Sequence, residues 1–551
     1  MKAMSGAVAS MPERSVAAAA SISRVASPGA PGWTKGGRWS WSSSWFWACP
    51  GGSPTDHAAA RISARMAVLR VVDFGMGVSL RGVPIRKSIH RQAGGRALQS
   101  ARPSEPFRKG VEMSRLLKML TFAVILSLAA VPARAQNPYA RPSLEVLAAA
   151  AGADGILPQP FIALTGANVI DVRSGSVLGD VSIVLREGRI VSVGPEAPPA
   201  AADVIDLRGR YVTPGFFEGH YHGSSVGSAH RALVSGVTTA RSASADGFSD
   251  IAQRDLVTAG YLAGPDILAA SVYVTPELGT TDDVLADPRL AKYLNRPVRG
   301  EAAVREVVRI NAEHGVDWIK TRTSGLSSRT SGPDALAMAF TVEELAAIMD
   351  EAERHGIPVA CHAHGIEVVI AGIEAGCRSI EHASYINEEA LRLMKARGTL
   401  WVPTYISVVG FELPHDDYAT TIARQRAPHI LENLQRMIRL GHEMGIPILT
   451  AVDTSYGPES VYRVAGEINA FIDFGMSPID ALRAATIRSA EAYGLADRTG
   501  AIEVGLEADL LVFDRNPLEQ PSVLHNPLAV LSNGRVGLNR SVGSAKVLPG
   551  Y

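Results

Sequence analysis

The sequence predicts an α/β fold, in which a (β/α)8 barrel is joined to a β-domain built from both ends of the folded region. Two observations predict it. Strand-like segments stand at both ends of residues 136–551, and the region between them alternates short apolar strands with amphipathic helices. Eight strand–helix units of this length are typical of such a barrel.

The two ends are rich in strand patterns. IALTGANVIDV, DVSIVLREGRIVSVG and DVIDLRGRYVT, within Phe161–Val212, alternate or run apolar between glycine-containing turns. AIEVGLEADLLVFDRNP and LAVLSNGRVGL have the same character near the C-terminus. We therefore expect residues 136–213 and 495–551 to form one composite β-domain, and residues 214–494 to form the barrel.

One segment, TVEELAAIMDEAERHGIPVACHAHG, shows the helix–strand pattern most clearly. Thr341, followed by Glu344 three residues later, predicts an N-terminal capping box. Apolar residues then recur at helical spacing until Gly356, after which Ile357–Cys361 is a predicted strand. Similar units predict eight parallel strands: Tyr211–Phe217, Val237–Arg241, Asp266–Ser271, Val316–Arg322, Ile357–Ala363, Ser379–Ala383, Leu400–Tyr405 and Ile446–Asp453.

The N-terminal region has a different composition. Residues 1–112 contain 16 Lys and Arg against 5 Asp and Glu, with no sustained apolar period, so we expect a disordered or non-native extension there. Met113–Ala135 has a basic start, a short apolar run and Ala133-Arg134-Ala135, which predicts a signal peptide cleaved before Gln136 and a periplasmic or secreted protein. The alternative is a genuine basic extension followed by a buried helix.

The predicted mature chain is acidic and poor in cysteine. It keeps 35 basic and 49 acidic residues, which argues against nucleic acid as a partner. After signal cleavage we expect no membrane span, and a homo-oligomer stays open. Cys361 and Cys377 make no disulfide framework, and we expect two small buried apolar side chains.

Polar side chains capable of metal binding recur at the predicted strand ends, where barrel enzymes place their chemistry. The residues are His220, His222, Lys320, His362, His382 and Asp453, and His364 stands two residues past His362. Imidazole and carboxylate groups are ligands for zinc and similar divalent ions. Four histidines and one aspartate exceed one open catalytic zinc site, which favours two metals sharing a bridging group. A buried, neutral lysine can add carbon dioxide and supply that bridge as a carbamate.

These motifs resemble those of the amidohydrolase superfamily. The resemblance rests on PGFFEGHYHG, GVTTAR, DWIK, HAHG, SIEHAS, TAVDT and the tail AATIRSAEAYGLADRTGAIEVGLEADLLVFDRNP, over about residues 162–545. It implies a distorted (β/α)8 TIM barrel with a small β-sandwich from both ends. It also implies two divalent ions, expected to be zinc: His220, His222 and Asp453 would bind one, His362 and His382 the other, with carboxylated Lys320 between them.

Two positions depart from the superfamily pattern. Glu218 stands where Asp or Asn is frequent, and Ala240-Arg241-Ser242 replaces a frequent Val-Arg-Asp. Neither change removes a ligand, so both bear on the shape of the pocket and on the substrate.

The expected reaction is attack of a metal-bridging hydroxide on an amide carbonyl, with Asp453 as general acid and base. Further substrate contacts are expected from His364, Arg322, Tyr405 and Tyr456, while His230, His314, His355 and His442 are expected to be structural. The resemblance is nearest to exported dipeptidases and carboxypeptidases, which implies peptides or N-acyl amino acids as substrates. The alternatives are an imidazolonepropionase-like hydrolase of a cyclic amide, lactone or ester, and a non-catalytic ligand-binding barrel.

Overall fold

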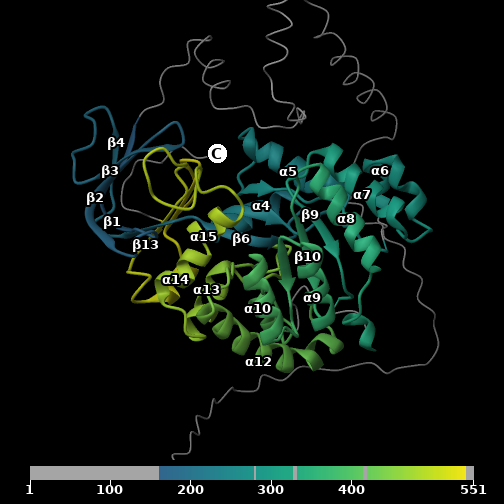
Figure 1. The fold of residues 1–551 in the computed structure, drawn as a ribbon. Coiled ribbons are helices and arrows are strands. Elements are labelled where there is room, and N and C mark those ends of the chain that lie inside the picture. The colour runs from purple at the N-terminus through teal and green to yellow at the C-terminus, as the bar shows by residue number, and fades with distance from the viewer. Residues whose placement is uncertain (1–160, 278–280, 327–331, 414–417, 541–551) are drawn as a thin grey trace, which may run out of the picture. The chain divides into compact units, whose positions relative to one another are not determined.

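The computed structural model describes residues 161–277, 281–326, 332–413 and 418–540. The predicted extension and signal peptide lie outside these residues. The described chain has an α/β fold with parallel sheets and a separate, mostly antiparallel sheet (Figure 1).

Both ends of the described chain contribute to one eight-stranded sheet. Its order is β15–β14–β13–β5–β1–β2–β3, and β4 pairs with β1. The central strand β5 pairs in parallel with β1 and antiparallel with β13, so it joins the two ends. The strands are β1 (Ile162–Ile170), β2 (Val177–Arg186), β3 (Arg189–Gly194), β4 (Asp203–Asp206), β5 (Tyr211–Pro214), β13 (Leu510–Phe513), β14 (Ala529–Ser532) and β15 (Arg535–Asn539).

Two parallel sheets lie between these ends in the sequence. One contains β6 (Phe216–Tyr221), β7 (Val237–Ser242) and β8 (Asp266–Leu268). The other contains β9 (Ile319–Arg322), β10 (Val359–Ala363), β11 (Ser379–His382) and β12 (Leu400–Val402). Single parallel bridges, Val274–Thr321, Trp401–Ile448 and Tyr221–Thr454, extend the pairing beyond the two sheets. The arrangement is that of a TIM-barrel-like α/β fold.

Helices lie around β6, β9 and β10 (Figure 1). Helix α8 begins with the predicted capping box, because Thr341 Oγ1 accepts from Glu344 N at 3.2 Å and Glu344 Oε2 accepts from Thr341 N at 2.9 Å. Among the described helices, none combines the length and the apolar composition needed to cross a membrane. The helices are α4 (Val226–Val234), α5 (Ser249–Thr258), α6 (Thr281–Ala286), α7 (Glu301–His314), α8 (Val342–Arg354), α9 (Ile366–Ala375), α10 (Glu388–Arg397), α11 (Tyr405–Gly410), α12 (Thr421–Glu443), α13 (Val464–Asp473), α14 (Pro478–Ala484) and α15 (Ile487–Ala492), with the 3-10 turns η1 (Asp246–Phe248), η2 (Pro288–Tyr293), η3 (Gly332–Ala335) and η4 (Pro521–His525).

The bounds of every predicted strand shift by at least one residue, and three of the differences have a clear cause in the backbone. The first splits at Gly215, whose N–H donates to Asp509 O at 2.9 Å, so Tyr211–Pro214 belongs to the eight-stranded sheet and β6 starts at Phe216. The seventh stops at Val402, because Thr404 has a left-handed backbone (φ +50°) and α11 follows at once. The eighth, Ile446–Asp453, pairs with a neighbouring strand only through the bridge of Ile448 to Trp401, and it ends in a left-handed residue, Asp453 (φ +54°).

The expectation for the two cysteines was wrong. Cys361 on β10 and Cys377 after α9 form a disulfide, with their Cα atoms 6.0 Å apart. The helix α9 returns the chain beside the strand that it left, which brings the two side chains within the range that a disulfide requires. Both residues are buried.

Candidate metal centre

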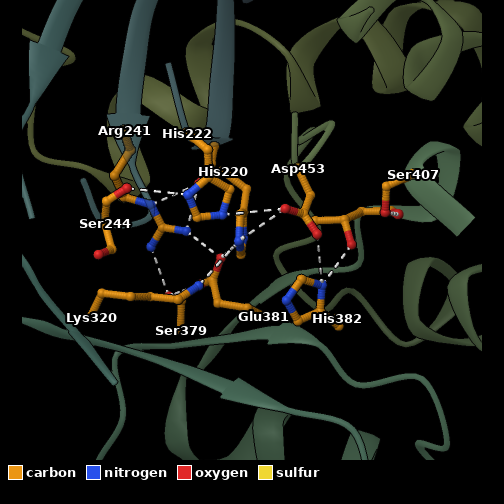
Figure 2. Close-up of polar contacts among 12 residues, drawn as sticks. His220, His222, Arg241, Ser244, Lys320, Ser379, Glu381, His382, Ser407 and Asp453 are labelled. Atoms are coloured by element: carbon orange, nitrogen blue, oxygen red, sulfur yellow. Dashed lines mark hydrogen bonds and ion pairs between the residues drawn. The ribbon is translucent and has the colours of Figure 1, made fainter. Parts of the chain in front are cut away.

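The predicted ligands meet at the ends of the parallel strands, and Figure 2 shows His220, His222, Lys320, His382 and Asp453 among them. His222 Nε2 lies 3.3 Å from Asp453 Oδ1, and His220 Nε2 lies 3.7 Å from the same oxygen. On the other side, His382 Nδ1 lies 3.8 Å from Asp453 Oδ2. Lys320 Nζ on β9 lies 3.2 Å from His220 Nε2. Asp453 therefore lies between His220 and His222 on one side and His382 on the other.

His364, predicted as a substrate contact, lies next to the histidines that are predicted as metal ligands. The rings of His362, His364 and His382 have their centroids 4.5, 4.6 and 4.9 Å apart. Donor atoms of these three histidines lie within 4.8 Å of one another, and so do donor atoms of His220, His382 and Asp453. The described chain thus offers two adjacent groups of donors that share His382.

The protonation states of these groups fit a divalent metal. Burial lowers the pKa of His220 to about 4 and that of His364 to about 3, and it holds the pKa values of His362 and His382 well below the usual range. Although burial opposes the charge of Asp453, His220 and His222 hold its pKa below the usual range. Neutral imidazoles and an ionised carboxylate are the forms that bind metals.

Lys320 has the environment needed for a neutral amine. Its side chain is 1 % exposed, and burial lowers its pKa to about 7, with a further contribution from the positive charge of Arg241. The environment of Lys320 thus favours the uncharged amine more than water does. An uncharged amine is the form that reacts with carbon dioxide, so the site fits a carboxylated lysine.

Glu381 and Arg241, whose roles sequence reasoning missed, form hydrogen bonds on the side of His220 that faces away from the other predicted ligands. Glu381 Oε2 accepts from His220 Nδ1 at 2.8 Å and from Arg241 Nη2 at 2.6 Å. Burial opposes the charge of Glu381, yet Arg241 holds its pKa well below the usual range. The signal was present in the motif SIEHAS, where Glu381 directly precedes the predicted ligand His382, and in GVTTAR, which ends in Arg241.

Glu218 lies beneath the site. Its carboxylate accepts from His220 N at 2.9 Å, from Val452 N at 2.8 Å and from the Tyr456 hydroxyl at 2.9 Å. Burial raises the pKa of Glu218 to about 7. Glu218, which departs from the superfamily pattern, is therefore not among the residues that line the pocket described below. Its carboxylate instead connects the two segments that carry His220 and Asp453.

Two predicted substrate contacts lie elsewhere. Tyr456 is fully buried and its hydroxyl faces Glu218, because its left-handed backbone (φ +50°) turns the chain inward. Tyr405 starts α11 instead of ending a strand, and its ring packs edge-on against Phe474 at 4.7 Å. Neither residue is among those that line the pocket.

The other aromatic and histidine predictions agree with the structure. The Tyr221 hydroxyl donates to Gln253 Oε1 on α5 at 3.0 Å, so Tyr221 points to the helix layer, as the period of two predicts. The predicted structural histidines lie in or at the ends of helices and outside the pocket lining: His230, His314, His355 and His442.

A pocket of about 220 Å³ opens above the donors. Its lining includes the apolar residues Leu326, Val408 and Phe411 as well as Asp246, Tyr273 and Arg322. The Arg322 Cζ lies 3.8 Å from the centroid of the Tyr273 ring. Its Nε has no hydrogen-bond partner, and no carboxylate in the described part of the chain lies within ion-pair distance of it.

A TIM-barrel-like fold with neutral histidines, a carboxylate and a buried lysine at its strand ends defines a metal-dependent hydrolase class. Residues 211–537 match the Amidohydrolase family, more than half of the chain. The chain therefore belongs to this family, and it is a hydrolase that acts on carbon–nitrogen bonds. The alternative of a non-catalytic ligand-binding barrel is thereby set aside.

Three known proteins are similar to this chain in sequence or structure. Ochratoxinase of Aspergillus niger is 26 % identical over 397 residues, which cover 65 % of this chain and 82 % of that protein. An imidazolonepropionase of Paracoccus denitrificans is 27 % identical over 396 residues, covering 64 % and 92 %. The crystal structure of a Xaa-Pro dipeptidase with methionine in its active site superposes with a TM-score of 0.59 at 28 % identity, covering 68 % and 99 %.

Proposed function

We propose that the protein cleaves the amide bond of a small substrate that carries a free carboxylate, such as a dipeptide or an N-acyl amino acid. The observation that carries the proposal is Arg322, a cation in the pocket wall that lacks a carboxylate partner among the described residues. A substrate carboxylate would form charge-assisted hydrogen bonds with this guanidinium. The methionine in the active site of the similar dipeptidase, a free amino acid, supports the same substrate class.

The donors support a site for two divalent ions, which we propose to be zinc. His220, His222 and Asp453 would hold one ion, His362 and His382 the other, and carboxylated Lys320 would bridge them. Bound ions of this kind supply a Lewis acid and a water of lowered pKa.

The surrounding residues perform the remaining tasks. Asp453 takes the proton of the attacking water and returns it to the leaving nitrogen. The Tyr418 hydroxyl donates to Asp453 Oδ1 at 3.0 Å and thereby orients this carboxylate. The apolar lining residues Leu326, Val408 and Phe411 would contact an apolar side chain of the substrate.

The strand ends support a closed barrel as the scaffold of this site. We propose that β6–β12 and the segment 446–454 form a distorted (β/α)8 barrel, because the three isolated bridges connect the two parallel sheets and this segment in the order of a ring. The eight-stranded sheet would supply the β-sandwich that accompanies it.

The test combines metal analysis with a library of dipeptides and N-acyl amino acids, each compared with its C-terminal carboxamide. We expect about two metal ions per chain and a strong preference for the free carboxylate. Arg322→Gln should lower kcat/KM for carboxylate substrates about 100-fold and change that for carboxamides much less. The exposed Arg392→Gln serves as the matched control. Turnover of carboxamides at equal rates would contradict the role of Arg322.

A second candidate is hydrolysis of a cyclic amide, lactone or ester. The similarity to an imidazolonepropionase favours it, and the donors at the strand ends are equally suited to that chemistry. Cyclic substrates without a carboxylate would then be turned over faster than any member of the dipeptide library.

We also propose that the protein is exported. The signal-peptide pattern of Met113–Ala135 supports this, and so does the disulfide, since disulfides persist in oxidising compartments. Fractionation of cells that express the gene would locate the protein, and purely cytosolic protein with an uncleaved N-terminus would contradict export.

A further inference from the structure

Arg241 and Glu381 form a buried contact that spans the two parallel sheets. Arg241 lies on β7 and Glu381 on β11, and their Nη2 and Oε2 atoms are 2.6 Å apart (Figure 2). Ser379 completes the arrangement: its hydroxyl accepts from Arg241 Nη1 at 2.9 Å and donates to Glu381 Oε1 at 2.5 Å. Both oxygens of the Glu381 carboxylate are therefore held, Oε2 by Arg241 and Oε1 by Ser379.

The same arginine also holds the backbone of the His220 segment. Its Nε and Nη2 donate to Gly219 O at 2.8 and 2.6 Å. Its guanidinium carbon lies 4.8 Å from the ring centroid of Trp318 and 5.2 Å from that of Tyr493. Planar stacking and a forked set of donors are properties of arginine that lysine lacks, so this position depends on the guanidinium shape as well as on its charge.

The arrangement fixes the tautomer of His220. Because the carboxylate of Glu381 accepts from Nδ1, the proton lies on Nδ1 and the lone pair on Nε2. That Nε2 faces Lys320 Nζ at 3.2 Å and Asp453 Oδ1 at 3.7 Å, so the nitrogen with the lone pair points at the other donors. Partners behind a metal-binding histidine raise its basicity and hold its ring.

We infer that Arg241 and Glu381 are positioning residues, which hold both the backbone and the ring of His220 in the geometry and tautomer that bind metal. The inference rests on the metal site of the proposed function but on none of its substrates. A purely structural role is the alternative, because breaking any buried ion pair destabilises a fold. The two roles differ in what they do to metal affinity.

The experiment measures Co²⁺ binding to the purified apoprotein by competition with a chromophoric chelator, together with the visible spectrum of the bound ion. Glu381→Gln keeps the shape of the side chain and removes its charge. Arg241→Lys keeps the charge and loses the fork. We expect each to weaken Co²⁺ binding about 10- to 100-fold and to alter the spectrum.

Glu351→Gln is the matched control. Glu351 on α8 is also a buried carboxylate, 3 % exposed, and it pairs with Arg309 Nε at 3.0 Å away from the pocket. We expect this variant to unfold at lower denaturant concentration while its Co²⁺ affinity and spectrum stay those of the wild type.

The inference is overturned if Glu381→Gln and Arg241→Lys lose stability as the control does but bind Co²⁺ with unchanged affinity and spectrum. If either does not fold, Ser379→Ala removes two hydrogen bonds of the arrangement without leaving an unpaired charge, and unchanged Co²⁺ binding in that variant overturns it equally. Wild-type protein that binds Co²⁺ but cleaves no amide would contradict the proposed function and leave this inference standing.

Discussion

Cys361 and Cys377 close a covalent loop that contains His362 and His364. The bridge has a sequence separation of 16 residues and runs from β10 to the turn before β11, the strand that ends in His382. It thus ties together the segments that carry three of the clustered histidines, and the geometry of this part of the site depends on a covalent bond as well as on packing.

Loss of this bridge should destabilise the protein. Cys377→Ala is expected to lower the free energy of unfolding by about 3 kcal/mol, the loop-closure contribution for a loop of this size. Denaturant titrations with and without reductant measure the effect. Reductant should lower the stability of the wild type and leave the variant unchanged, and a wild type indifferent to reductant would show that the bridge contributes nothing.

Replacement of Asp453 should abolish most of the activity while the fold survives. Asp453→Asn removes the proton acceptor, so we expect kcat to fall about 10²- to 10⁴-fold. Asparagine tolerates the left-handed backbone at this position (φ +54°), which keeps the main chain in place. Asp514→Asn, at a side chain that is 65 % exposed, is the control. Comparable kcat values in the two variants would remove Asp453 from the mechanism.

Lys320 distinguishes a bridged metal pair from a single-metal site. Lys320→Ala should lose at least one metal ion per chain and most of its activity, because it removes the amine that would carry the bridging carbamate. Apoprotein reconstituted with metal should also regain more activity with bicarbonate than in buffer free of carbon dioxide. Full activity in Lys320→Ala would favour the imidazolonepropionase-like alternative.

Asp509 should make stability depend on pH. Burial, together with Glu507 and Asp266, raises its pKa from the usual 3.8 to about 7 in the folded protein. A raised folded-state pKa gives stability that is fully present below about pH 4 and is lost as pH rises through about 7. Asp509→Asn keeps a hydrogen-bonding side chain toward Thr499 and Asn533 and removes the charge.

The melting temperature of Asp509→Asn relative to the wild type should therefore increase between pH 4 and pH 8. The exposed Asp497→Asn is the control, and its difference from the wild type should stay constant over that range. A constant difference for Asp509→Asn as well would show that this carboxyl group does not titrate in the window.

The sequence predicted the features that depend on local pattern and spacing. Strand period and unit length predicted that His220, Lys320, His362, His382 and Asp453 meet, because parallel strands carry their C-terminal ends to one edge. Contacts that depend on three-dimensional approach were missed. Arg241 and Glu381 lie on strands of different sheets, and no sequence spacing reports their distance.

Left-handed backbones account for most of the remaining errors. Thr404 turns the chain after β12, which removes Tyr405 from the pocket, and Tyr456 is itself left-handed and faces inward. Such residues are uncommon outside glycine, and no pattern in the sequence marks them. The disulfide was missed for a related reason, since only the return of α9 brings its two cysteines together.

The pairing of β5 with both β1 and β13 also determines when the eight-stranded sheet can finish folding during synthesis. A ribosome delivers the chain from its N-terminus, so β5 waits for its antiparallel neighbour until almost the whole protein has been synthesised. Until then β5 exposes an unpaired edge, which is a template for association with other chains. Truncation near residue 510 would therefore remove the partner of β5 and destabilise the first strands of the sheet, which lie far from the cut in sequence.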